Sequence, residues 1–438
     1  RQKAFQQTEA EKQENLKKIC DEVFGESNFV NSIIWEKRYS PQNAVQWFSE
    51  NHDFIIVYAK NKMLWQPELL PRTDEMNARY TNRDNDPRGV WKAENATAQA
   101  GHGTQSQFYV LTAPNGKKHT LPSGRCWLYT EPVMKQMIAD NRIWFGEDGN
   151  NVPAVNRFLT EVKQGIACQT IWKYEDVGHS QEGKKELKAM FPEGIPFDTP
   201  KPERLLERIT HLAGQDNFIV MDFFSGSATT AHAVMQLNAE DGGHRKFIMV
   251  QLNESVRKGS EAEKAGYKTI DGIGRERIRR AAAKIKAEHP DTSADLGFKT
   301  YYLKSMPKET LDKIKTFDPN ALISSDGDIV KFLGEKTLLQ TWQIKDGFGF
   351  NAVPQKIDLS GYTAYLLDDE KIGKYLYLLG EVEEKSIKEL IRKIESLELT
   401  VDKIFIYGYS FDFNTLTSIT TNLKTLKNRN PLEPIVRY

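Results

Sequence analysis

The chain has 438 residues, a length that suits two to four domains of about 100–200 residues each. Hydrophobic residues make up 39% and charged residues 27%, a composition that is typical of globular proteins and excludes an intrinsically disordered chain. Sixty basic side chains balance sixty acidic ones, so a surface for a charged partner must come from local clusters.

The three cysteines lie far apart and form no CxxC or Cys/His group. This predicts a reducing compartment, structural thiols and no metal site. No apolar run approaches the ~18 residues that a membrane span needs, and the first twenty residues are too polar for a signal peptide. We therefore expect a cytoplasmic protein without membrane contact.

The N-terminal segment predicts one helix and then two strands. Residues 8–25 carry apolar side chains at helical spacing, with a capping box that starts at Thr8 and a C-terminal cap at Gly25. Residues 28–38 and 52–60 are typical of strands. The continuous apolar middle of the second strand predicts burial on both faces, as in parallel α/β sheets.

From about residue 66 to 165, turn signals alternate with short aromatic stretches such as "QFYVLT", "CWLYT" and "RIWFG". This predicts an inserted, β-rich module. An α/β pattern returns over residues 183–250, and a strongly basic helix, "GIGRERIRRAAAKIKAE", follows it. A further α/β region begins after about residue 292, with "KSIKELIRKIESL" as a helix and "KIFIYGY" as a strand. The fold class is therefore α/β.

A candidate ligand site lies at "MDFFSGSATT", residues 221–230, where a strand enters a turn of small residues and then a helix. Such a turn lets the backbone approach a ligand and aims the N-terminal amides of the helix at it. A dinucleotide fingerprint and a Walker A loop are both absent from this turn. The turn is then suited to a ligand with a bulky polar group and no phosphate, and S-adenosylmethionine fits that description. The alternative is a plain strand–helix joint without a ligand.

The stretch "MDFFSGSATTAHAVMQLNAEDGGHRKFIMVQLNE" resembles the first and second cofactor motifs of DNA amino-methyltransferases. In detail the chain resembles the modification (Mod) subunit of type III restriction–modification systems, which are β-group adenine-N6 methyltransferases. "PFDTPKPERLLERI" is similar to the tenth motif of that family, beside the cofactor. "DEVFGESNFVNSIIWEKR" and "HDFIIVYAK" are similar to the stretch after the catalytic motif, and "DNDPRGVWKAEN" and "GRCWLY" to the target-recognition region.

The resemblance covers nearly the whole chain and implies four parts. Residues 1–65 would be part of the methyltransferase core, 66–165 an inserted β-rich target-recognition domain, and 166–291 the cofactor-binding half of the core. Residues 292–438 would form a C-terminal α/β domain for dimer or partner contacts. The core is expected to be a Rossmann-like S-adenosylmethionine-dependent methyltransferase sheet that is incomplete at its N-terminal side.

The resemblance also implies a role for each position of the cofactor motifs. The turn would line the methionine and adenosine parts of S-adenosylmethionine, and the tenth motif would form the wall near the methionine carboxylate. The end of the next strand would offer an acceptor to the ribose. The cofactor-binding residues are Thr199, Lys201, Pro202, Asp222, Phe223, Phe224, Ser225, Gly226, Ser227, Ala228, Thr229, Gln251 and Glu254.

Two positions depart from the family pattern. The family prefers glycine at Ala228, and we expect the extra methyl group to be tolerated because alanine suits the first turn of a helix. The second motif usually ends on an acidic ribose acceptor, whereas this strand ends on Gln251, with Glu254 three residues later. Because a glutamine can also accept from a hydroxyl, both residues are candidates for ribose binding.

Methylation of adenine requires a flipped base, an acceptor for its amino group and an aromatic ring stacked on it. The family supplies these groups with (Asp/Asn)-Pro-Pro-(Tyr/Phe/Trp), N-terminal to the stretch that opens this chain. "DNDPRG", "SPQN" and "RNPLEP" do not match that motif. We therefore expect no catalytic residue in this chain, no methyl transfer by it alone and a weakened cofactor site.

The target-recognition region is expected to bind double-stranded DNA, because arginines read base edges and lysines hold phosphates. The DNA-binding candidates are Arg72, Tyr80, Arg83, Arg88, Lys92, Lys117 and Lys118. Trp91, Trp127 and Trp144 are expected in the core of the module, and His179 and His232 in structural roles. The basic helix at "RERIRRAAAKIK" predicts either a solvated face or a phosphate-contacting one.

The leading hypothesis is thus a Mod subunit that methylates adenine in DNA, acts as a homodimer and binds a restriction–helicase (Res) subunit. The alternative is a catalytically inactive DNA-recognition fragment or remnant of such a subunit. A nicotinamide enzyme is the third hypothesis.

Overall fold

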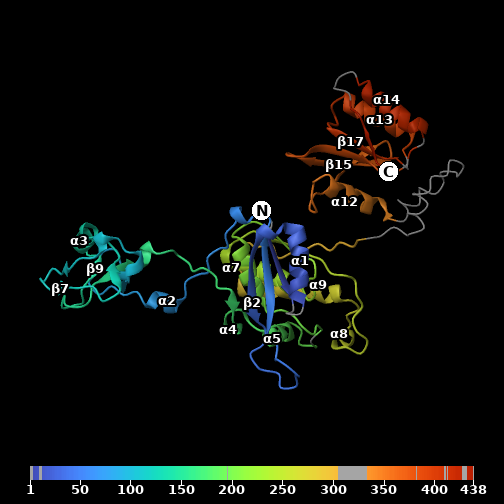
Figure 1. Ribbon diagram of the computed structural model, residues 1–438. Helices are drawn as coiled ribbons and strands as arrows, with labels where there is room; N and C mark the ends of the chain where they lie inside the picture. The colour runs from blue at the N-terminus through green and yellow to red at the C-terminus, as the bar shows by residue number, and fades with distance from the viewer. Residues whose placement is uncertain are drawn as a thin grey trace. The chain divides into compact units, whose positions relative to one another are not determined.

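A computed structural model describes residues 3–8, 12–194, 196–303, 333–380, 382–408, 411, 413–426 and 432–437. The fold is mixed α/β, as the sequence predicts (Figure 1). The chain divides into two compact units, Arg1–Phe298 and Lys299–Tyr438, each with its own hydrophobic core.

The first sheet of the N-terminal unit contains the strand pair that the sequence predicts. Its order is β1-β3-β2-β11, and its elements are β1 (Lys3–Thr8), β2 (Phe29–Glu36), β3 (His52–Ala59) and β11 (Ile171–Trp172). β3 is buried on both faces, but it pairs antiparallel with both neighbours, so the expected parallel arrangement is wrong for this strand. Its central position between two partners explains the continuous apolar run equally well.

The helix that precedes β2 is α1 (Gln13–Phe24). Gly25 caps its C-terminal end, as predicted, with a positive φ of 85°. The predicted capping box is wrong, because Thr8 belongs to β1. A single sequence did not reveal that strand, whose pairing partner β3 lies about fifty residues later in the chain.

The second sheet of this unit holds the candidate cofactor turn. β12 (Ile219–Asp222) runs parallel to β13 (Lys246–Met249), and α7 (Thr229–Asp241) connects them. Against α7 pack α6 (Glu203–Ala213) and α9 (Ile270–Glu288). The remaining helices here are α4 (Tyr174–Val177), α5 (Ser180–Met190) and α8 (Glu261–Lys264).

The segment over residues 66–165 is rich in short strands. Three of them form a sheet, β4 (Trp91–Asn95), β10 (Ala154–Phe158) and β9 (Ile143–Trp144). Two further pairs are β5 (Thr97–Gln99) with β8 (Arg125–Trp127), and β6 (Leu111–Thr112) with β7 (Lys118–His119). Its helices are α2 (Asp74–Ala78) and α3 (Glu131–Ala139).

The core of this module contains Trp91 and Trp127, both fully buried, as the sequence predicts. Trp144 is half-buried against Trp91, with ring centroids 5.3 Å apart. At the base of the module, Leu70 and Ile166 pair as an isolated antiparallel bridge, which holds its two connections to the core side by side.

The C-terminal unit is a five-stranded sheet with the order β14-β15-β16-β17-β18. Its strands are β14 (Gln355–Leu359), β15 (Tyr362–Asp369), β16 (Gly373–Leu378), β17 (Lys403–Tyr407) and β18 (Ile435–Arg437). The helices are α12 (Glu335–Lys345), α13 (Glu384–Glu395) and α14 (Phe413–Lys424). α13 and β17 confirm the helix and the strand predicted here.

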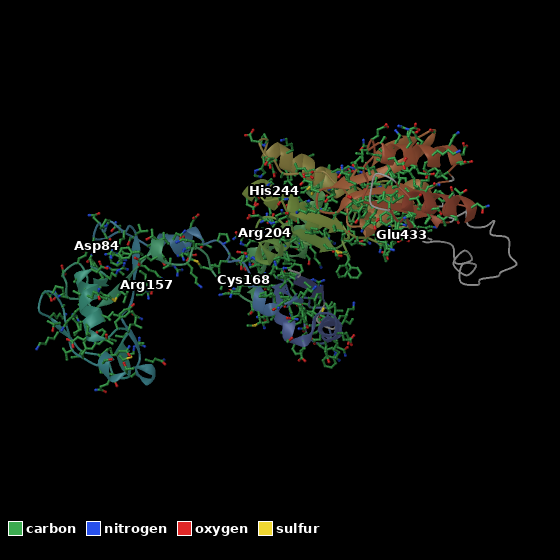
Figure 2. The ribbon with its side chains drawn as sticks, turned by 90° about the horizontal axis from the view of Figure 1, so that it is seen from above. Asp84, Arg157, Cys168, Arg204, His244 and Glu433 are labelled. Atoms are coloured by element: carbon green, nitrogen blue, oxygen red, sulfur yellow. The ribbon has the colours of Figure 1, made fainter. Side chains whose placement is uncertain are left out.

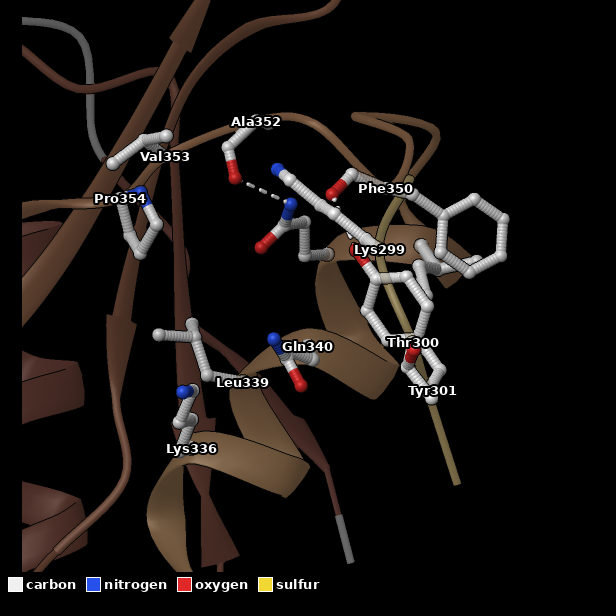
Figure 3. A pocket seen from close by; sticks show the side chains of 12 residues that line it. Lys299, Thr300, Tyr301, Lys336, Leu339, Gln340, Phe350, Ala352, Val353 and Pro354 are labelled. Carbon is white, nitrogen blue, oxygen red and sulfur yellow. Dashed lines mark hydrogen bonds between the residues drawn. The ribbon is translucent and has the colours of Figure 1, made fainter. Parts of the chain in front are cut away.

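A groove of about 420 Å³ in this unit lies beside α12 (Figure 3). Tyr301 forms part of its wall, and its hydroxyl donates to the carbonyl of Phe350 at 2.9 Å. The groove therefore belongs to the C-terminal unit and holds no residue of the candidate cofactor turn.

Within the part of the chain that the structure describes, no helix is both long and apolar enough to cross a membrane. The same residues contain no group of three or more His, Cys, Asp or Glu side chains that could hold a metal ion. All three cysteines are free thiols.

Candidate cofactor site

Asp222 at the end of β12 organises the turn that follows it. Its Oδ1 accepts the backbone N–H of Phe224 at 3.1 Å, and its Oδ2 accepts the hydroxyl of Thr230 at 2.6 Å. One carboxylate thus ties the turn to the first residues of α7. The N-terminal end of a helix carries unpaired N–H groups and a partial positive charge, and this connection fixes the position of that helix end relative to the turn.

The neighbouring strand supports the other side of the turn. The backbone N–H of Ser225 donates to the carbonyl of Val250 at 3.1 Å, and that of Gly226 donates to Oε1 of Gln251 at 2.8 Å. Glu254 lies on the exposed surface three residues further on. Of the two ribose candidates, Gln251 therefore supports the turn, whereas the carboxylate of Glu254 faces solvent.

Gly226 adopts a left-handed conformation with φ of 49°. A Cβ at this position would lie 3.0 Å from Cζ of Phe197, a residue of the "FDTPKP" segment. Both facts favour glycine, because other residues are strained at positive φ and the space above the turn is occupied. Phe223 and Phe224 follow the strand with their rings exposed and 5.1 Å apart.

The structure contradicts the expectation that Ala228 lies in the first turn of the helix. Ala228 is the residue before α7 rather than part of the first helical turn, and its φ of 59° and ψ of 38° are left-handed. That conformation costs an alanine about 1–2 kcal/mol. Its buried methyl group lies against Gly274 of α9, and burial of one such group contributes about 0.8 kcal/mol in the other direction. Packing therefore offsets part of the strain.

The tenth-motif segment meets the turn from the opposite side. The hydroxyl of Thr229 donates to the carbonyl of Lys201 at 3.3 Å. The ammonium of Lys201 lies 5.5 Å from the ring centroid of Trp35, at the end of β2. Thr199 is exposed and Pro202 is buried beside α6. The structure thus brings the two predicted halves of the cofactor site together.

Gly183 of α5, which sequence reasoning missed, fixes the path of that segment. A Cβ on Gly183 would lie 2.6 Å from the carbonyl oxygen of Pro200 and 2.9 Å from backbone atoms of Lys201 and Pro202. These neighbours are backbone, so they cannot rotate away. Helix and segment approach this closely only because residue 183 has no side chain.

We expect Gly183→Ala to displace the 200–202 backbone and to weaken S-adenosylmethionine binding about ten-fold. Overpacking of this kind costs typically ~1–3 kcal/mol of stability. Isothermal titration calorimetry and thermal unfolding measure the two effects. Gly272→Ala is the matched control, because the nearest atom to its Cβ would be the hydroxyl of Thr269 at 3.4 Å. Equal cofactor affinity in both variants would contradict the role given to Gly183.

A buried polar network lies beneath the turn. Arg277 of α9 has 0% exposed surface, and its Nη1 donates to the hydroxyls of Thr229 at 2.6 Å and Ser227 at 3.2 Å. Burial lowers the pKa of Arg277 to about 10, against the opposing effect of the Glu186 and Glu203 carboxylates. The guanidinium therefore stays charged at neutral pH and links α9 to the turn.

The network also contains two glutamates and one histidine whose pKa values are shifted by burial. Burial raises the pKa of Glu203 to about 7 and also raises the pKa of Glu186, while it lowers the pKa of His232 strongly. Nε2 of His232 and Oε1 of Glu203 lie 3.0 Å apart, but neither atom has a hydrogen-bond partner within the described residues. Because its pKa is lowered, the buried His232 is neutral at neutral pH, and its structural role stays a prediction.

The basic helix α9 has an exposed face that carries Arg279, Lys284 and Lys286, which agrees with the solvated face, one of the two predicted possibilities. Besides the buried Arg277, its exposed and half-exposed cations pair with acids: Arg275 with Asp271 at 2.9 Å, and Arg280 with Glu193 at 2.6 Å. Part of the positive charge of this helix is therefore balanced by neighbouring acids, and a phosphate-contacting role stays a prediction.

In the 66–165 module, several DNA-binding candidates take part in internal contacts. Arg88 pairs with Asp86 at 2.6 Å and with Asp140 at 3.2 Å, and the bonds from Arg88 hold the pKa of Asp86 well below its usual range. Tyr80 is buried, and Lys92 pairs with Glu94 at 2.9 Å.

The other candidates in the module differ in exposure. Arg72 donates to Asn77 and lies over the ring of Tyr80. Arg83, Lys117 and Lys118 are exposed. Figure 2 labels Asp84, which accepts the indole N–H of Trp91, and Arg157, which pairs with Glu94.

Strand β12 of the two-stranded sheet beside the turn presents apolar side chains to solvent. β12 pairs with β13 on one edge, and no described strand covers its other edge. Ile219 and Met221 on this strand are exposed, as are Phe224 and Leu252 beyond the strand ends. The strands of a parallel α/β sheet are normally buried on both faces, so the exposure of Ile219 and Met221 departs from that pattern.

Comparison with known proteins gives a consistent result. The DNA methylase family matches residues 3–262, and the family of type III restriction–modification EcoP15I C-terminal domains matches residues 333–432. The Mod subunit of the type III enzyme StyLTI from Salmonella typhimurium is 35% identical over 95% of this chain and 66% of that protein. The EcoP15I Mod subunit from Escherichia coli is 28% identical over 95% of this chain and 67% of that protein.

The type II methyltransferase M.KpnI from Klebsiella pneumoniae is 26% identical over 59% of the chain. The chain spans about two thirds of the length of the Mod relatives. The match to the methylase family contains the turn, the tenth-motif segment and Gln251. The chain therefore belongs to the DNA methylase family, as a homologue of the Mod subunits of type III restriction–modification enzymes.

Proposed function

We propose that this protein transfers a methyl group from S-adenosylmethionine to the N6 amino group of an adenine in double-stranded DNA. The observation that carries the proposal is the turn after β12, which both Asp222 and Gln251 hold against the N-terminal end of α7. S-adenosylmethionine would supply an electrophilic methyl group bound to a positively charged sulfur.

The residues present fit this cofactor in three ways. Unpaired N–H groups at the start of α7 would meet its carboxylate, and Lys201, whose carbonyl accepts from Thr229, would add a positive charge to this part of the site. The exposed carboxylate of Glu254 would accept from the ribose hydroxyls, since Gln251 already accepts from Gly226. The exposed rings of Phe223 and Phe224 would contact the adenine ring.

We also propose that the adenine-binding half of the site belongs to another segment of the protein. The open edge of β12 and the exposed Ile219 and Met221 form an apolar surface beside the cofactor turn. A segment with further strands and an (Asp/Asn)-Pro-Pro-aromatic motif would complete the Rossmann-like sheet and bring an amino-group acceptor to the methyl donor.

The module over residues 66–165 would read the DNA sequence. Of the predicted contacts, Arg83, Lys117 and Lys118 are the best supported, because their side chains are exposed. Arg88 would instead stabilise the module through Asp86 and Asp140. Residues 333–432 match a family named for a type III enzyme, which supports a second Mod copy and a Res subunit as partners.

The test incubates the full-length protein with tritium-labelled S-adenosylmethionine and genomic DNA. The DNA comes from a strain that lacks this protein. We expect label in N6-methyladenine, and sequencing of the modified DNA then gives the recognition site. Cofactor binding and DNA binding without methyl transfer would instead support a catalytically inactive DNA-recognition protein. A calorimetric signal with NAD but none with S-adenosylmethionine would overturn the proposal.

A further inference from the structure

The loop that joins β2 to β3, residues 37–51, carries two large aromatic side chains in water. Trp47 is 81% exposed and Phe48 is 89% exposed. Every residue from 41 to 48 is exposed, and no acidic side chain occurs between Tyr39 and Ser49. Two adjacent, almost fully exposed aromatic side chains form an apolar patch of the kind that marks an interaction site.

The base of this loop is held firmly, in contrast to its tip. Lys37 pairs with Asp53 at 2.5 Å, and the backbone N–H of Arg38 donates to the carbonyl of Asn51 at 3.1 Å. The ring of Tyr39 packs on His179 with centroids 5.2 Å apart. The two ends of the loop are therefore anchored to the sheet and to His179.

A continuous chain of contacts connects this base to the cofactor turn. The backbone N–H of Ser180 donates to the carbonyl of Lys37 at 3.0 Å. Trp35, two residues before Lys37, lies beneath the ammonium of Lys201, and the carbonyl of Lys201 accepts from Thr229 at the start of α7. The loop thus leaves the sheet at the end where the methyl donor would bind.

We propose that Trp47 and Phe48 enter the DNA base stack at the position from which the target adenine is withdrawn. The inference rests on the proposed function, because a base can reach the methyl donor only after it leaves the duplex. Its departure leaves a gap, and apolar side chains that insert between base steps offset the lost stacking. Aromatic rings suit this role because they stack on any base.

The test compares the full-length protein with a Trp47→Ala/Phe48→Ala double variant on two duplexes. One duplex pairs the target adenine with thymine, and the other has a mismatch at that position, which lowers the cost of flipping. We expect the double variant to methylate the paired duplex at least ten-fold more slowly and the mismatched duplex within two-fold of the unaltered rate. With 2-aminopurine as the target base, its fluorescence increase on binding should fall in parallel.

Met63→Ala is the matched control, since Met63 is 90% exposed just after β3, away from this loop. Unaltered rates in the double variant would overturn the inference. An equal loss on both duplexes would also overturn it, and would assign the aromatic pair to a protein partner, a second copy included. Methylation by the unaltered protein is measured alongside, so failure of the proposed function itself is seen separately.

Discussion

The Arg277→Met variant should lose about 3 kcal/mol of the free energy of unfolding of the N-terminal unit, and its S-adenosylmethionine affinity should fall by at least ten-fold. Removal of one member of a buried charged group costs ~3–5 kcal/mol, because the opposite charges stay buried without compensation. Here the substitution removes a cation that acts on both the Glu186 and the Glu203 carboxyl groups, while Lys284 still acts on Glu203. Protonation of Glu203, whose pKa is already about 7, limits the loss to the lower end of that range.

The effect on the cofactor follows from the hydrogen bonds of Arg277. Its Nη1 donates to Ser227 and Thr229, both buried, so methionine leaves two hydroxyls without this donor at the start of α7. A hydrogen bond to a charged group contributes ~1.5–3 kcal/mol, and relaxation of the turn would relieve part of the cost of losing it. A relaxed turn no longer presents the helix amides to the methionine carboxylate.

Two further variants separate this role from a general effect on α9. Arg279→Met removes a half-exposed arginine from the same helix, where a surface pair with Glu276 contributes at most ~1 kcal/mol. Arg277→Lys keeps a buried cation and should recover part of the affinity. Urea denaturation and calorimetry measure both quantities. If Arg277→Met and Arg279→Met gave the same cofactor affinity, the positioning role of Arg277 would be refuted.

The strand–turn–helix of the cofactor site was predictable because its information is local. The apolar strand, the small residues at 225–228 and the start of α7 follow one another directly, so strand and helix signals could be read without knowledge of distant contacts. The same holds for α13 and β17, each with a strong pattern in a short segment. Only family resemblance connected residues 199–202 to this turn.

The parts that were missed depend on contacts between distant segments. Gly183 is decisive only because the backbone of Pro200 passes it, and Ala228 is left-handed because the turn between Asp222 and α7 requires it. Arg277 carried a readable signal, since it lies four positions before Ala281 and eight before Ile285 on the buried face of α9. The run of positive charges around it hid this helical spacing.

The charged residues of the 66–165 module also depend on contacts that a single sequence does not reveal. A single sequence displays Arg88 as a basic residue in a loop, but its partner Asp140 lies 52 positions away. Asp86, two residues before it, was the available clue, because an acid so close to an arginine favours a local pair. Whether a cation is free for DNA thus depends on where the fold places the acids.

Gly226→Leu should abolish measurable S-adenosylmethionine binding. A leucine at a φ of 49° is strained by about 1–2 kcal/mol, and its Cβ would lie 3.0 Å from Cζ of Phe197. Relief of both strains would move the turn away from Gln251, whose Oε1 accepts the N–H of residue 226. Unfolding of the C-terminal unit should not change, because that unit has its own core.

Gly242→Leu is the control that separates backbone strain from crowding at the site. Gly242 ends α7 with a φ of 72°, so leucine meets a comparable conformational penalty, yet no atom lies within 4 Å of its Cβ. Cofactor binding should therefore persist in Gly242→Leu and disappear in Gly226→Leu, both measured by calorimetry. Retention of affinity within two-fold in Gly226→Leu would show that the turn does not contact the cofactor. Loss in both variants would mean that α7 as a whole, rather than the turn, responds to the strain.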